Sequence, residues 1–179
     1  MNSNKQTYVY IMVSKTNTLL GMTIQKMLGV SYNHCSIALD DSLETIYSIG
    51  RKELHNIFNA GFVVEGKGCG YFAAHENSNI ILVRIAVDYE EKERIYEEIL
   101  KYQNEQCKYN LLGLIYCYFG IAKERDNRKF CSQFVAEVLE SSDVNLFDKP
   151  ATLIRPHDFL EIPSAEVVYY GSIGNYHSA

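Results

Sequence analysis

The chain has 179 residues, of which 47% are hydrophobic and 12% aromatic, which suits one globular domain over residues 1–179 with a sizeable core. Its net charge of -5, together with the lack of a lysine and arginine cluster, argues against nucleic acid as a partner. The apolar run near the N-terminus is too short for a signal-peptide core, and no stretch is long enough to span a membrane. We therefore expect a cytoplasmic protein that does not insert into membranes.

The first half of the chain is predicted to form several strands and one helix. Residues 7–13 are rich in β-formers and predict a strand, and an apolar stripe over 19–28 predicts the helix. Residues 34–39 and 43–49 predict a β-hairpin whose polar turn is 40–42. Residues 50–78 lack sustained periodicity, apart from a short strand at 61–65, and are typical of a surface excursion that covers a site.

The second half alternates strands and helices. The apolar run 79–87 predicts a strand within the sheet, and 89–105 predicts a charged helix with the i,i+4 pairs Glu90/Arg94 and Glu97/Lys101 on a solvated face. A more apolar helix is predicted from Asn110, as N-cap, to Phe119, and another from Cys131 to about Ser142. The helix from Asn110 is expected to bury Leu111, Leu114, Ile115 and Tyr118. The helix from Cys131 is expected to bury Phe134, Val135, Val138 and Leu139, with Glu137 facing water. A last strand is predicted at 165–171.

The five cysteines predict reduced thiols. They stand at 35, 69, 107, 117 and 131, an odd number without CxxC spacing, so neither a disulfide framework nor a zinc site is indicated. Cys35, Cys107 and Cys117 have apolar neighbours and are expected to fill the core, whereas Cys69 lies in a glycine-rich loop and is the one rival nucleophile to Cys131.

Cys131 begins a predicted helix, where unpaired N–H groups and the macrodipole favour a thiolate. The thiol pKa of about 8.5 falls to between about 3.5 and 7.5 at such positions, most strongly beside an imidazolium. His34 is the candidate base, because it begins a strand next to the polar residues 31–33, while the other histidines lie in predicted loops, in the tail or after a proline. A structural cysteine and a core histidine are the alternatives.

The two segments YNHCSIALDD and FCSQFVAEVLE resemble the permuted papain-fold cysteine hydrolases, the permuted branch of the NlpC-type amidases that includes YiiX-like proteins. The resemblance extends from about Tyr8 to Phe159 and, more remotely, to lecithin retinol acyltransferase-like enzymes. In this branch the histidine strand precedes the cysteine helix, as it does here. The resemblance implies an α+β, circularly permuted papain-like fold, in which an antiparallel sheet packs against helices and the nucleophile Cys131 lies at a helix N-terminus.

The third catalytic residue departs from the family pattern. Relatives place a histidine, glutamate or similar polar residue on the second hairpin strand, and the corresponding position here is Tyr47. A two-residue turn at 41–42 puts Tyr47 diagonally opposite His34 on the same face, and this register is the one we favour. A turn one residue longer puts Glu44, Ile46 and Ser48 on that face instead. Glu65 is a further alternative.

These residues together predict a thiol-dependent hydrolase or acyl transferase. Cys131 would attack an amide or ester carbonyl, His34 would act as base and then acid, and water or another acceptor would resolve the acyl-enzyme. The backbone N–H of Ser132, with Gln133 as a further donor, would hold the oxyanion. The resemblance suggests peptide-like or cell-wall-derived substrates, then lipid acyl groups, without a metal or cofactor. The alternative is a non-catalytic binding module that keeps the papain-like groove.

Overall fold

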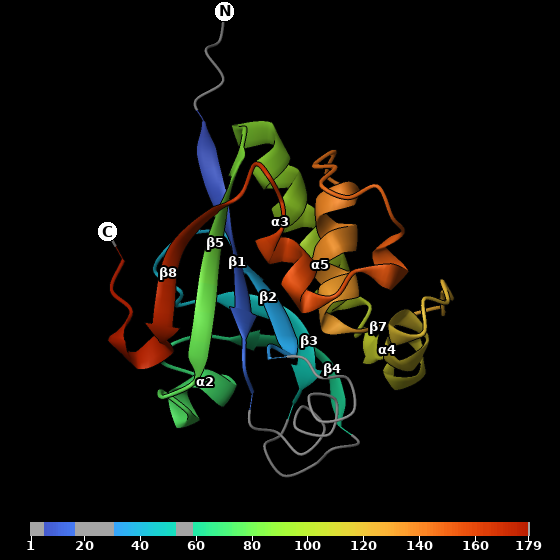
Figure 1. The fold of residues 1–179 in the computed structure, drawn as a ribbon, viewed down its shortest axis with the longest axis horizontal. Helices are drawn as coiled ribbons and strands as arrows, with labels where there is room; N and C mark the ends of the chain where they lie inside the picture. The colour runs from blue at the N-terminus through green and yellow to red at the C-terminus, as the bar shows by residue number, and fades with distance from the viewer. Residues whose placement is uncertain (1–5, 17–30, 53–58, 179) are drawn as a thin grey trace, which may run out of the picture.

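The computed structural model describes residues 6–16, 31–52 and 59–178, which form a mixed α+β fold around one sheet (Figure 1). The helix expected over 19–28 lies outside these residues. In the described part of the chain the sheet has eight strands in the order β7-β6-β4-β3-β2-β1-β5-β8. Neighbouring strands are antiparallel except β6 and β7, which are parallel. The strands are β1 (Thr7–Ser14), β2 (His34–Ala38), β3 (Ile46–Arg51), β4 (Ala60–Glu65), β5 (Asn79–Val87), β6 (Lys108–Tyr109), β7 (Arg128–Lys129) and β8 (Glu166–Ser172).

The helices are distributed over both faces of this sheet. Two of them, α3 (Tyr89–Asn104) and α5 (Cys131–Glu140), lie next to each other on one side (Figure 1). The short helix α2 (Gly70–Ala74) covers part of the other side, where its Phe72 is fully buried. The remaining helical elements are α4 (Leu111–Tyr118) and the 3-10 turns η1 (Ala151–Leu153), η2 (Pro156–Leu160) and η3 (Ile173–Asn175). None of the described helices has the length and apolarity needed to cross a membrane.

Strand alternation divides the core into two layers, because successive side chains along a strand point to opposite faces. We call the side covered by α5 and α3 the α5 face, and the other side the α2 face. Buried apolar side chains of the α5 face are Val9, Ile11, Val13, Cys35, Ile37, Ile49 and Phe62, which pack with Phe134, Val135 and Val138 of α5. Those of the α2 face are Met12, Ala38, Ile46, Ile80 and Leu82, which pack with Leu43 and Phe72.

The main elements of the predicted chain are confirmed, with their ends shifted by a few residues. Asn110 is the N-cap of α4 and its side chain accepts a hydrogen bond from the Gly113 backbone N–H at 2.9 Å. The expected surface excursion at 50–78 is only partly irregular, since it contains β4 and the unpredicted helix α2. Five residues are too few for a helical period to be visible in the sequence.

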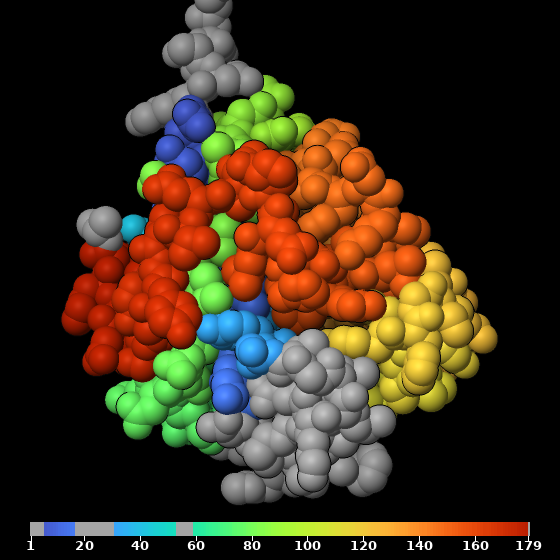
Figure 2. Space-filling model, viewed as in Figure 1, coloured from blue at the N-terminus to red at the C-terminus, as the bar shows by residue number. Residues whose placement is uncertain are grey.

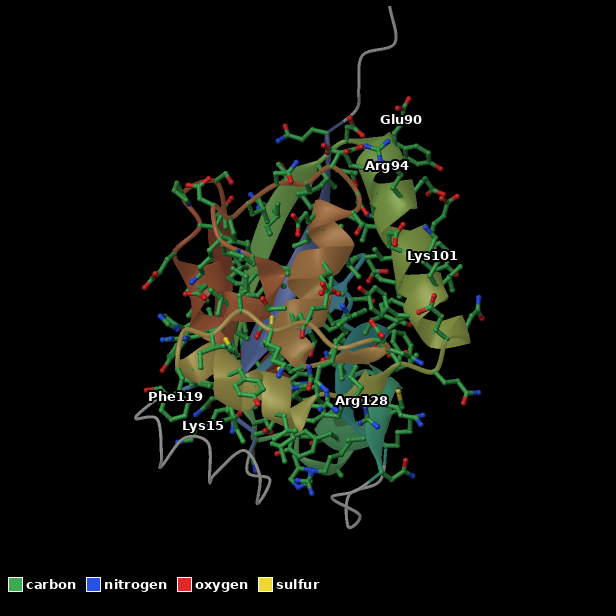
Figure 3. The ribbon with its side chains drawn as sticks, turned by 90° about the vertical axis from the view of Figure 1, so that its right-hand side faces the viewer. Lys15, Glu90, Arg94, Lys101, Phe119 and Arg128 are labelled. Atoms are coloured by element: carbon green, nitrogen blue, oxygen red, sulfur yellow. The ribbon has the colours of Figure 1, made fainter. Side chains whose placement is uncertain are left out.

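The predicted burial of α4 is partly wrong. Leu114 is buried, but Leu111 and Ile115 are each 44% exposed, and Phe119, just past the end of the helix, is 76% exposed and projects from the surface (Figure 3). A helix that is apolar on all sides has no sequence signal for which side faces the core. Its buried side, through Leu114 and Cys117, contacts Phe130 immediately before α5.

The expected ion pairs of α3 are also different. Arg94 lies 3.6 Å from Asp143, and Lys101 pairs with Glu98, one residue nearer than the predicted Glu97. Both cations lie at the surface of the helix (Figure 3). The expectation that this charged face is solvated is confirmed, but the partners follow from the neighbouring loop and the i,i+3 spacing.

Candidate functional site

Cys131 is the first residue of α5, and the elements before it fix its position. The residues of β7 pair with β6, and Phe130 follows as an extended N-cap with φ of -105° and ψ of 168°. The helix then carries the sulfur against the sheet, where the residue is only 3% exposed. Three backbone N–H groups hydrogen-bond the sulfur, those of Cys131, Ser132 and, across from the helix, Cys35 of β2.

Burial nevertheless raises the pKa of the Cys131 thiol to about 11, because removing the sulfur from water disfavours the thiolate. The three N–H groups act in the opposite direction and lower the pKa, but by less. The prediction of an unusually acidic thiol is therefore wrong for the closed site in this structure. The expected helix-terminus donors are present, and desolvation outweighs them.

His34 begins β2 and pairs with Ser14 of β1. Its ring extends across β3, because Cε1 lies 3.5 Å from the position that a Cβ at Gly50 would occupy. Burial lowers the pKa of this imidazole to about 4, so the ring is neutral at pH 7. A glycine at position 50 leaves the space that the ring uses.

The thiol and the histidine lie on opposite faces of the sheet and are related through the backbone of β2. The sulfur accepts a hydrogen bond from the N–H of Cys35, the residue that directly follows His34 in the chain. Among the described residues no hydrogen bond joins the imidazole itself to the sulfur. The resting arrangement is thus a neutral thiol on α5 and a neutral imidazole on β2, related through the backbone of Cys35.

The favoured register of the hairpin is wrong. Tyr47 pairs with Ile37, so its side chain lies on the α5 face, 6.3 Å from Phe62 between ring centroids, and is not on the same face as His34. The connection between the strands is longer than a two-residue turn: Asp40 accepts from the Ser42 N–H at 3.0 Å, and Leu43 adopts a left-handed φ of 56°. The alternative register holds, which places Ile46 and Ser48 on the face of His34.

The rivals for the third catalytic position differ in distance from His34. Glu65 pairs with Ile46, four residues along β3 from Gly50, which is about 14 Å at the rise of a strand. Glu44 lies exposed in the turn beyond Ile46. Ser48 is the nearest of the three, but its hydroxyl donates to the Cys35 carbonyl at 2.7 Å. Ser48 therefore fixes the strand that carries His34, and Gly50, opposite His34, supplies no side chain.

Further residues around Cys131, on its other side, were not predicted from the sequence. Tyr109 of β6 and Tyr118 of α4 both interact electrostatically with the thiol, and burial raises the pKa of each phenol, that of Tyr118 to about 12. Cys117 lies beside them. Arg155 places its guanidinium carbon 5.1 Å from the centroid of the Tyr118 ring. Nothing in the spacing of these residues relates them to Cys131, because three separate elements bring them together.

One turn beyond Cys131, α5 carries a polar network instead of a solvated face. Glu137 was expected to face water, but its side chain is 15% exposed and accepts hydrogen bonds from Lys129, Gln133 and Tyr102 at 2.8, 2.8 and 2.6 Å. The Gln133 amide nitrogen is therefore directed to Glu137, away from the role of oxyanion donor. Its carbonyl oxygen is buried, without a hydrogen-bond partner in the part of the chain that the structure describes.

Two further groups bear on the chemistry. Cys35, Cys107 and Cys117 are buried and Cys69 is exposed, as expected. His157, Asp158 and Glu161 offer ligand atoms within 4.8 Å of one another, a set of the kind that binds metal ions. Asp158, however, is bonded to Lys149 at 2.8 Å and to the Arg155 N–H at 2.6 Å, and the lysine charge opposes a divalent cation there.

No known family profile matches the chain, and no curated protein matches it at a significant level. The functional assignment therefore depends on the geometry and charge around Cys131.

Proposed function

We propose that the protein is a thiol-dependent hydrolase or acyl transferase with a permuted papain-like fold, in which Cys131 is the nucleophile and His34 the general base. The observation that carries the proposal is the position of Cys131 at the head of α5, with its sulfur between two helix N–H groups and the N–H that follows His34. The order of the elements, a histidine strand before a cysteine helix, also agrees with the permuted family.

The first step of the reaction moves the thiol proton to His34 as sulfur attacks an amide or ester carbonyl. In the closed site the thiol pKa of about 11 lies above the imidazole pKa of about 4, so the neutral pair is strongly favoured. Each pKa unit corresponds to about 1.4 kcal/mol, which makes opening of the site to substrate part of the activation. A polar carbonyl group in the site would reduce the desolvation that sets both values.

The later steps use groups already in place. The developing oxyanion would be held by the backbone N–H of Cys131 or Ser132, which needs no side chain. The imidazolium of His34 then returns its proton to the leaving group, and water or another acceptor resolves the acyl-enzyme. Ser48 positions the base, because its hydroxyl bonds the carbonyl of the residue after His34. Tyr47 is not on the same face, so no side chain of the family pattern orients the imidazole.

Peptide-like amides, including cell-wall-derived fragments, are the substrates that the family resemblance favours, and lipid acyl groups are the second class. The proposal places the reaction in the cytoplasm and requires no metal or cofactor. A second function is favoured by one observation: the resting thiol is closed and not acidic, as expected for a binding module that keeps the fold without the chemistry.

The pH dependence of Cys131 alkylation by iodoacetamide, read residue by residue by mass spectrometry, separates the two functions. A hydrolase gives an inflection well below the free-thiol value of about 8.5 when an amide or ester ligand is bound, and His34→Ala removes that inflection. The exposed Cys69 is the internal control, since its rate should be the same in both chains. Thermal unfolding of His34→Ala and His34→Gln checks that the fold is retained.

A rate at Cys131 that rises only towards pH 11, with or without ligand, and that ignores the His34 substitutions would reject the catalytic proposal. The binding module would then be the remaining function, and binding of amide ligands without acyl-enzyme formation would be its direct measurement.

A further inference from the structure

Among the described residues, Arg155 is a cation without a carboxylate partner, and it lies beside Cys117 and Tyr118 of α4. In the part of the chain that the structure describes, its guanidinium makes no salt bridge, and its neighbours are the Tyr118 ring, 5.1 Å away, and the Cys117 thiol. The residue is half-buried. An arginine removed from water normally pairs its planar fork with a carboxylate or phosphate, so an unpaired one beside a site is available to an anionic ligand.

The chain before Arg155 is fixed to the head of α5. The carbonyl of Ile154 accepts a hydrogen bond from the Ser132 hydroxyl at 2.7 Å, and the Cys117 thiol lies 3.9 Å from the same oxygen. Ser132 directly follows Cys131, so the backbone that carries Arg155 is tied to the residue beside the nucleophile. Figure 2 shows the orange-red surface of this segment next to the light-blue start of β2, the strand of His34.

The nearest acidic residue in sequence does not neutralise Arg155. Asp158 accepts from the Arg155 backbone N–H at 2.6 Å and from the Lys149 ammonium at 2.8 Å, so its charge is balanced by Lys149. The side chain of Asp158 is 11% exposed, whereas that of Lys149 is 43% exposed. The pair holds the turn of η2, and in the described part of the chain Asp158 forms its side-chain ion pair with Lys149 and not with the Arg155 guanidinium.

The other groups around the thiol are neutral. Tyr109 and Tyr118 are protonated at pH 7, since a phenol pKa is ordinarily about 10 and burial raises the pKa of both. Burial also raises the pKa of the Cys117 thiol. Among the described residues, the site therefore combines an uncharged nucleophile and base with Arg155, a cation without a salt bridge, on the side formed by α4 and the segment before η2.

We propose that Arg155 binds a carboxylate of the substrate, so that the Cys131 site is selective for amides or esters that carry a carboxylate near the scissile carbonyl. This inference rests on the proposed function for the role of Cys131 and adds the substrate class. Arg155 is then a specificity-determining residue, which contacts the substrate at a distance from the reacting carbon. The bidentate geometry of a guanidinium with a carboxylate would also set the orientation of the acyl group.

A matched pair of alkylating reagents tests this without turnover. Bromoacetylglycine carries a carboxylate one peptide unit from the reactive carbon, and bromoacetylglycinamide is its neutral equivalent; in both, the sulfur–carbon bond forms as bromide leaves. The ratio of the two rates at Cys131, measured at low ionic strength in the full chain, should fall about tenfold in Arg155→Gln. Arg155→Lys should retain part of the preference, because it keeps the charge and loses the fork.

Two controls separate a local effect from general electrostatics. The ratio at the exposed Cys69, measured in the same digest, should not change in any variant. Arg94→Gln on α3 removes the same charge far from the site, at the top of the helix in Figure 3, and should leave the ratio at Cys131 unchanged. A ratio at Cys131 that Arg155→Gln does not alter would overturn the inference.

Ligand binding keeps the two proposals distinguishable. Thermal stabilisation of the chain by N-acetylglycinate, compared with N-acetylglycinamide, should depend on Arg155. A thiol inert to both reagents, together with Arg155-dependent binding of the carboxylate, would reject the hydrolase and leave the anion site. A reactive thiol with equal binding of the two ligands in the parent and in Arg155→Gln would reject the anion site and leave the hydrolase.

Discussion

The two faces of the sheet bury different kinds of side chain. On the α5 face, the buried side chains of β1 to β4 are all apolar or thiol, and they meet an apolar stripe of the helix. On the α2 face, the same strands bury Ser14, Ser36, Ser48 and Glu65, each no more than 6% exposed. Alternation along β2 shows the contrast within one strand, where Cys35 and Ile37 point one way and His34 and Ser36 the other.

The difference shows where this molecule keeps its polar groups. The α5 face provides packing energy and holds the candidate nucleophile within its buried cluster. The α2 face holds the candidate base and the buried carboxyl of Glu65, and burial shifts the pKa of both groups. Buried polar groups cost free energy unless they are hydrogen-bonded, so the second face should be the more sensitive to pH and the less sensitive to loss of volume.

The largest predicted effect is on the α5 face. Phe134 is fully buried and makes edge-to-face contacts with Phe62 and Tyr102, at centroid distances of 5.8 and 5.0 Å. Phe134→Ala should lower the free energy of unfolding by about 3 to 5 kcal/mol, because it removes the contacts and leaves a cavity. Urea denaturation measures this, with the exposed Phe119→Ala as matched control, expected within about 0.5 kcal/mol of the parent. Equal effects of the two substitutions would contradict the assignment of this face as the main core.

The second predicted effect concerns Glu65 on the α2 face. Burial raises the pKa of this carboxyl to about 7, and the Tyr71 N–H, 3.2 Å from its oxygen, opposes the rise. The folded state thus holds the proton more tightly than the unfolded one, so stability is highest below pH 4.5 and falls as pH rises to 7. The loss amounts to about 3 kcal/mol. Glu65→Gln should match the parent near pH 4 and exceed it in stability at pH 8.

His34 gives the opposite slope and serves as the counterpart. Its pKa is lowered to about 4 by burial, so the unfolded state binds the proton more tightly and stability rises as pH increases from 4 to 6.5. In the parent chain the two slopes oppose each other between about pH 4.5 and 6.5. Denaturant titrations should therefore show the rise alone in Glu65→Gln and the fall alone in His34→Gln. Variants with the same pH profile as the parent would contradict both burial assignments.

The helix of Cys131 shows which buried residues can be predicted from the sequence and which cannot. Its apolar stripe of Phe134, Val135, Val138 and Leu139 is local information, and the structure buries all four against the sheet. Glu137 is the exception on the same helix. It is buried because Lys129 and Tyr102 reach it from other elements, and a partner contributed from elsewhere in the chain leaves no trace in helical periodicity.

The hairpin marks the limit of prediction at the candidate site. Its two strands follow from composition, but the choice between Tyr47 and Ser48 as neighbour of His34 depends on one residue in the turn, and the left-handed Leu43 that decides it has no glycine or asparagine signature. Arg155 could not be related to Cys131 at all, since their link is a hydrogen bond from Ser132 to Ile154.

The smallest predicted effect compares two serines on adjacent strands of the α2 face. Ser48 donates its hydroxyl to the Cys35 carbonyl at 2.7 Å, whereas the buried Ser36 hydroxyl has no hydrogen-bond partner among the described residues. Ser48→Ala should therefore lower the free energy of unfolding by about 1 to 2 kcal/mol, while Ser36→Ala should leave it unchanged or raise it by up to about 1 kcal/mol. The substitutions are chemically identical and both sites are fully buried, so volume effects cancel in the comparison.

Urea denaturation of both variants tests whether hydrogen bonding controls stability on this face. A larger loss for Ser36→Ala than for Ser48→Ala would mean that the hydroxyl of Ser36 is satisfied in solution, and that the α2 face is better paired than the structure indicates. The alkylation profile of Cys131 adds a functional reading, because Ser48 holds the carbonyl of Cys35, whose N–H bonds the sulfur. Loss of the Ser48 hydrogen bond in Ser48→Ala should shift the inflection in the pH profile of Cys131 alkylation with ligand bound. Ser36→Ala should leave that inflection unchanged.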